Sequence, residues 1–259
     1  MTGQPETVEM DFVAPRHLAG GGDPAWVTVP LHRACGWSHG NDPLMPRVIL
    51  SSPDQTALLR LEPANGLQWW ALHHTAEGDR PAWSTSFGAG TPVETIAAVA
   101  DALTDPATSL ATGTDPYEPL LDADWKPHSS TDGLVSPDGR AYVEHIVTEA
   151  SDCWLASTTL GPSQRPVWQA VFSRHTPPVL ISAFTRALAD TSPVPRQYIS
   201  LTVPAYGTRL ITHTQRELPA QQVASALEDR VRALAERRPA PPTPLRPPKP
   251  PPTGPRRLR

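Results

Sequence analysis

The chain has 259 residues with a net charge of −4, and 39% of the residues are hydrophobic. No run approaches the roughly 20 apolar residues that a membrane-spanning helix needs, and the N-terminus lacks the basic start and apolar run of a signal peptide. With no export signal, the two cysteines Cys35 and Cys153 indicate a cytoplasmic protein with free thiols. The 33 prolines favour loops, short strands and at least one unfolded segment.

The N-terminal residues 1–24 contain three consecutive glycines, Gly20 to Gly22, and few apolar residues, so we expect a flexible arm. The glycines precede Pro and Trp instead of joining a strand to a helix, which argues against a phosphate-binding loop. Further on, His32, Cys35 and His39 form one loose group without the two tight ligand pairs of a zinc site. We therefore expect neither a metal nor a cofactor.

Residues 25–106 are predicted to form a unit of four strands and one helix. Residues 83–87 alternate between large apolar or Thr side chains and small polar ones, which is the period of a half-buried strand. The helix is expected to begin with Thr91 as N-cap, Pro92 at its first position and Glu94 closing a capping box. The predicted strands cover residues 47–50, 56–61, 69–75 and 82–87.

The same order of elements returns after a linker over residues 107–122. The segment RPAWSTSFGAGTPVETIAAVADALTD from Arg80 aligns without a gap with RPVWQAVFSRHTPPVLISAFTRALAD from Arg165, at an offset of 85. Upstream, the Ser-Pro-Asp turns at Ser52 and Ser136 align at an offset of 84. Residues 123–192 are therefore predicted to be a second copy of the unit.

A single four-stranded sheet with one helix leaves part of the sheet uncovered. Two copies can cover each other, as the subunits of symmetric dimers do. The predicted fold class is therefore α+β, a tandem repeat of a four-stranded antiparallel sheet plus one helix that forms an intramolecular pseudo-dimer.

The C-terminal part is predicted to contain a β-like patch, an amphipathic helix and a disordered tail. Residues 193–238 carry the patch, at 198–203 and 208–212, and then the helix, which begins near residue 219. Residues 239–259 are expected to be an extended, disordered tail rich in Pro and Arg. The last 23 residues hold seven Arg or Lys and no acid, and without them the net charge of the remaining chain is −11.

Several of these segments resemble a known family. The wording RHLAGGGDPAWVTVPLHRACGW from Arg16, the Ser-Pro-Asp turns and the repeated Arg-Pro-x-Trp segments resemble the domain-of-unknown-function family three-one-seven of streptomycetes and related actinobacteria. The resemblance covers roughly residues 15–235 and implies a duplicated domain, but it implies no activity. By topology alone, paired units of four strands and a helix look like the Whirly and positive-cofactor-four fold, whose members bind single-stranded nucleic acid.

The sequence contains no catalytic signature. It has no GxSxG elbow, no HExxH, no Gly-rich phosphate loop and no paired-carboxylate motif, so we expect a protein that is not an enzyme.

Tryptophans suggest which sheet face is open. Trp70, Trp83, Trp154 and Trp168 stand at equivalent points of the two copies and are expected in the core, whereas Trp69 points the opposite way by alternation. An aromatic ring, an Arg, a His and hydroxyls on an open sheet face are typical of a platform on which unpaired bases stack. The alternative is that these faces pack against each other or against the C-terminal helix. The candidate nucleic-acid-binding residues are Arg60, Trp69, His73, Ser84, Ser86 and Tyr142.

We therefore expect a non-enzymatic protein that binds single-stranded DNA or RNA through this face, although the acidic body counts against that function. The alternative is a protein-interaction or scaffolding module that recruits a partner through its proline-rich tail. In the first case five cations of the tail would assist binding: Arg246, Lys249, Arg256, Arg257 and Arg259.

Overall fold

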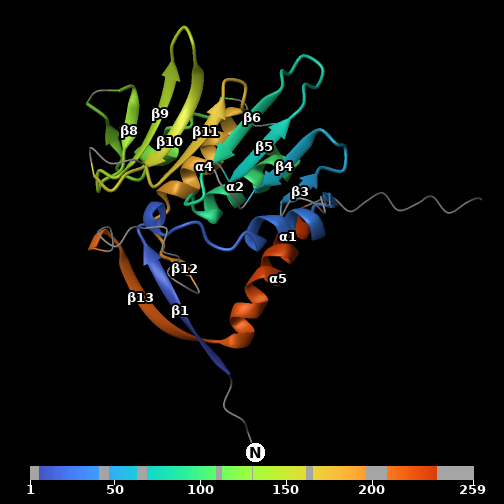
Figure 1. Cartoon of the computed structure of the whole chain (residues 1–259), viewed down its shortest axis with the longest axis vertical. Helices are drawn as coiled ribbons and strands as arrows, with labels where there is room; N and C mark the ends of the chain where they lie inside the picture. Colours follow the sequence, from blue (N-terminus) through green and yellow to red (C-terminus); the bar gives the residue numbers. More distant parts are fainter. Residues whose placement is uncertain are drawn as a thin grey trace, which may run out of the picture.

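The computed structural model describes residues 6–40, 47–62, 69–108, 113–129, 131–161, 166–196 and 209–237. Within these residues the fold is α+β, with one ten-stranded sheet, one three-stranded sheet and five α-helices (Figure 1). All strand pairs are antiparallel. No helix in these described segments is long and apolar enough to cross a membrane.

Each copy of the repeat contributes five consecutive strands to the large sheet and then one helix, where the sequence predicted four strands. The additional strand is short and lies at the outer edge of the sheet in both copies. The first copy comprises β2 (Ser38–Gly40), β3 (Val48–Ser51), β4 (Ala57–Leu61), β5 (Trp70–His74), β6 (Trp83–Phe87) and α2 (Val93–Thr104). The second comprises β7 (Lys126–Pro127), β8 (Gly133–Val135), β9 (Ala141–Val147), β10 (Asp152–Thr158), β11 (Trp168–Ser173) and α4 (Pro178–Ala189).

The two copies are joined where β6 pairs with β11. Phe87 lies opposite Ala170 and Thr85 lies opposite Phe172, while Ser86 lies opposite Val171. At the offset of 85, Phe172 is the counterpart of Phe87 and Ala170 is the counterpart of Thr85. The register is therefore unchanged when the two copies are exchanged.

Aromatic side chains fill the space between this junction and the helices. The rings of Phe87, Phe172 and Phe184 lie with their centroids 5.1–6.0 Å apart, and Phe184 comes from α4. Trp70, Trp83 and Trp168 are buried, as predicted from their alternation. Trp154 is only partly buried, because it lies between Tyr117 and His145 at the edge of the core.

The predicted start of α2 is wrong. Pro92 is the N-cap, and no side chain caps the helix. The Glu94 carboxylate instead accepts two hydrogen bonds from the guanidinium of Arg196, at 2.6 and 2.9 Å. A bidentate ion pair is stronger than the neutral contact of a capping box, so the distant arginine takes the carboxylate.

The predicted flexible arm over residues 1–24 is ordered from β1 onwards. Strand β1 (Thr7–Ala14) pairs with β12 (Val194–Arg196) on one side and β13 (Thr212–Pro219) on the other. A short turn of 3-10 helix, η1 (Arg16–Leu18), follows β1. The sequence signal was misread because β1 has few apolar residues, and its stability comes from pairing with strands about 200 residues away.

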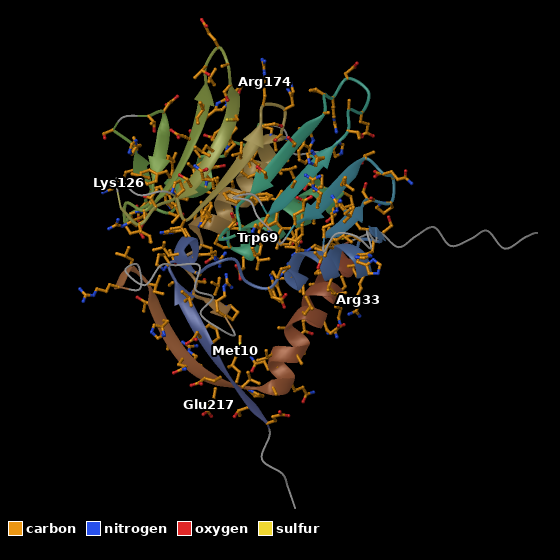
Figure 2. The ribbon with its side chains drawn as sticks, viewed as in Figure 1. Met10, Arg33, Trp69, Lys126, Arg174 and Glu217 are labelled. Atoms are coloured by element: carbon orange, nitrogen blue, oxygen red, sulfur yellow. The ribbon has the colours of Figure 1, made fainter. Side chains whose placement is uncertain are left out.

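The second lobe returns to the repeats through two packed helices. The predicted C-terminal helix is α5 (Ala220–Glu236), and it packs against α1 (Ala25–Arg33) (Figure 1). Arg33 of α1, labelled in Figure 2, pairs with Glu228 of α5. The remaining helix, α3 (Glu118–Leu121), precedes β7. The patch at 198–203 and the tail at 239–259 lie outside the described residues.

The junction predicts a large effect of truncating Phe172. We expect Phe172→Ala to lower the free energy of unfolding by about 3–5 kcal/mol, because it leaves a cavity among three aromatic rings. Urea unfolding followed by circular dichroism measures this difference. Val147→Ala is the matched control, because Val147 is 66% exposed at the end of β9 and should tolerate truncation. Equal effects of the two changes would contradict the core assignment.

Candidate functional site

The candidate site is the face of the ten-stranded sheet opposite α2 and α4. The strand register places His73 beside Leu58 and Ser84, and it places Ser86 between Ala71 and Val171. Tyr142 lies on the same face in β9, three strands from β6. The structure thus brings the predicted residues of the first copy together and sets Tyr142 apart from them. One row of side chains crosses the middle of the face: Arg60, Ala71, Ser86, Val171, Leu155 and Glu144.

The arginine of this row is held by an acidic neighbour. The Nε of Arg60 lies 3.0 Å from the Glu62 carboxylate, and an Arg47 nitrogen lies 3.5 Å from the same oxygen. At the far end of the row, Glu144 adds a negative charge. Because polyanions bind to unneutralised cations, this arrangement weakens the case for a phosphate-binding surface.

The two aromatic residues of the predicted platform are already engaged. Trp69 precedes β5, its N–H donates to the Phe87 carbonyl at 3.0 Å, and its side chain is partly buried against the main core (Figure 2). The Tyr142 hydroxyl donates to the Gly139 carbonyl at 2.8 Å, and its ring meets the edge of His128 at 5.3 Å. Each ring therefore offers a base less open surface than the sequence suggested. The tail cations lie outside the described residues.

The histidine and cysteine group near α1 does not converge on one point. The Nδ1 of His32 lies 2.8 Å from the Trp37 carbonyl, Cys35 is buried, and His39 is exposed in β2. Across the part of the chain that the structure describes, no three His, Cys, Asp or Glu side chains are placed to hold a metal ion.

The Ser-Pro-Asp turns are built alike in both copies. The Ser52 hydroxyl donates to Asp54 at 2.5 Å and accepts the Ala57 N–H at 2.9 Å. In the second copy the Ser136 hydroxyl donates to Asp138 and accepts the Ala141 N–H at the same distances. Both serines are buried, so each turn closes its hairpin from within.

The second turn also holds the N-terminal segment. The Nε2 of His17 lies 2.9 Å from the second carboxylate oxygen of Asp138. Partial burial raises the pKa of Asp138, but the hydrogen bond and charge of His17, with the bonds from Ser136 and Arg140, outweigh it and lower the pKa to about 2. The carboxylate lies between serine and histidine, whereas a hydrolytic triad needs the histidine next to the serine. We interpret the group as a structural lock.

This lock predicts a characteristic acid sensitivity. A carboxylate whose pKa falls from 3.8 to about 2 on folding contributes stability above pH 3.8, and that contribution is lost as the pH falls through about 2. We expect Asp138→Asn to be less stable than wild type at pH 7 and to show a flatter change of melting temperature between about pH 4 and pH 2. Asp54→Asn is the matched control, since Asp54 makes the same turn without a histidine. Identical pH profiles for the two variants would exclude the role of His17.

Comparison with known proteins agrees with the duplication. The model of the SPDY family, described as a domain of unknown function (DUF317), matches residues 51–108 and again residues 135–194. Both matches begin one residue before a Ser-Pro-Asp turn and end beyond the following helix. No curated protein and no solved structure matches the chain. The chain therefore carries two copies of a sequence that matches the DUF317 domain.

Proposed function

We propose that this protein is a non-enzymatic protein-interaction module whose open sheet face binds a partner protein. The observation that carries the proposal is the middle of the face, where the uncharged residues Ala71, Ser86, Val171 and Leu155 form one continuous row across four strands. A flat, uncharged surface with a charged rim suits a protein better than a polyanion.

The arrangement of the two copies supports the same proposal. The symmetric register of β6 and β11 favours an intramolecular pseudo-dimer, and in that arrangement the face is continuous from one copy to the other. The pairing of Arg60 with Glu62 and the net charge of −11 outside the tail both disfavour the alternative, a single-stranded nucleic acid on the sheet. The chain would act in the cytoplasm, where its two cysteines stay reduced.

Site-specific cross-linking can test this function in the full chain. A photoreactive amino acid at Gln169, which is exposed on β11, should cross-link a protein in the native cells, whereas the same group at Val147 should not. Leu155→Glu should abolish the cross-link because it places a charge in the uncharged row, and its melting temperature shows whether the fold is intact.

A nucleic-acid assay supplies the contrary outcome. Binding to single-stranded DNA should be the same for wild type, Trp69→Ala and Arg60→Ala. A base-stacking platform would instead make Trp69→Ala weaker by roughly fivefold to a hundredfold. That loss, with cross-links to nucleic acid at Gln169, would overturn the protein-binding proposal.

A further inference from the structure

A cavity of about 610 Å³ lies beside the junction of the two copies. Its walls come from the end of β6, the end of α2 and the first turn of α4. Trp83, Leu103, Asp105, Val179 and Leu180 are among its lining residues. The cavity is distinct from the open sheet face, so a proposal about one can fail without the other.

The repeat places an equivalent location in the second copy. At the offset of 85, Trp83 corresponds to Trp168 and Asp105 corresponds to Asp190. The first turn of α4 corresponds in the same way to the first turn of α2. In this second location, however, the N-terminal segment 15–22 fills the space.

Three contacts show how the N-terminal segment is bound. The Arg16 guanidinium donates to the Asp190 carboxylate at 2.6 Å and to the Ala187 carbonyl at 2.8 Å. The Trp168 indole N–H donates to the His17 carbonyl at 2.8 Å. Leu18 is 1% exposed and packs against Leu160.

The glycines that follow let the segment lie flat against α2. The Val93 N–H donates to the Gly21 carbonyl at 2.7 Å. A Cβ atom at Gly21 would come within 2.5 Å of the Ala89 carbonyl oxygen, which no side chain could accept. Both copies therefore form the walls of the filled location, as both form the walls of the cavity.

In the cavity the corresponding groups lack partners. One carboxylate oxygen of Asp105 accepts the Ala107 N–H at 2.8 Å, just as one oxygen of Asp190 accepts the Ser192 N–H. Among the described residues, the other oxygen of Asp105 and the indole N–H of Trp83 have no hydrogen-bond partner. The Trp83 ring is held by stacking on His74, with centroids 5.3 Å apart. An occupant must therefore bring a cation, a carbonyl and an apolar side chain.

The chain contains one further segment of this kind. Residues 15–18 read Pro-Arg-His-Leu, and residues 255–258 of the tail read Pro-Arg-Arg-Leu. His17 faces Asp138, whose counterpart in the first copy is Asp54, so both tail arginines meet a carboxylate at the corresponding positions. The tail also starts at the right place, because Arg237 lines a small recess together with Asp105. The 17 residues between Arg237 and Pro255 can span roughly 50 Å when extended, which is ample for a return to the cavity.

We propose that the cavity of the first copy is a peptide-binding site for residues 255–258 of the same chain. Arg256 pairs with Asp105, the carbonyl of Arg257 accepts the Trp83 indole N–H, and Leu258 enters the apolar part of the cavity. The site repeats the contacts of residues 15–18 in the second copy. The tail thereby competes with any other basic Pro-Arg-x-Leu peptide for this cavity.

The indole N–H resonance of Trp83 in the full ¹⁵N-labelled chain tests this binding. The double variant Arg256→Glu, Leu258→Ala should shift this resonance and speed its hydrogen exchange at least about tenfold, because the carbonyl acceptor is lost. The matched control is Arg246→Glu, Leu245→Ala, which changes the same residue types within the same tail and should leave Trp83 unaffected. The Trp168 resonance should stay constant in both.

Assignment and alternatives are covered by further measurements. Trp83→Phe identifies the resonance, and Asp105→Asn should reproduce the effect of the motif variant if the aromatic change disturbs folding. An unchanged Trp83 resonance in the motif variant would overturn the proposal, as would an equal effect of the control, which would indicate general charge attraction. A shift that grows with protein concentration would overturn the intramolecular assignment and indicate binding between two chains.

Discussion

The antiparallel pairing of β6 with β11 is the contact on which the rest of the structure depends. Each copy alone would end in an exposed edge strand, which is a template for aggregation. Their union removes both edges and brings Phe87 and Phe172 together under α4. The edges that remain belong to β2 and β7, which have three and two residues. Short edges of this kind limit pairing with other chains.

Three arginines attach the second lobe to this sheet. Arg196 is 5% exposed and bonds to Glu94 and to the carbonyls of Ala19 and Gly20. Arg230 of α5 pairs with Asp101 of α2 and lies over the Trp26 ring. Arg16 makes the third link. A buried guanidinium needs all of its partners, because a partner's loss leaves a desolvated charge. The N-terminal segment is therefore an integral part of the fold.

Local patterns predicted what local forces determine. The duplication, both helices and the membership of the open face follow from apolar periodicity and alternation, which depend on neighbouring residues. The order of β1 did not follow, because its partner β13 lies about 200 residues away. The role of Glu94 was hidden for the same reason, since Arg196 is remote in the sequence. The glycines at 20–22 indicated flexibility, yet the structure uses them for close approach to Ala89.

The two copies differ most usefully where their neighbours differ. Glu94 binds Arg196 at the filled location, and its counterpart in the cavity wall is Val179, which cannot bind an arginine. Asp105 and Asp190, by contrast, are identical, as are Trp83 and Trp168. The cavity thus retains the groups that recognise Pro-Arg-x-Leu and lacks the group that recognises Arg196. A site that had lost its ligand would have no reason to keep the first set, so this selective difference favours a separate occupant for the first copy.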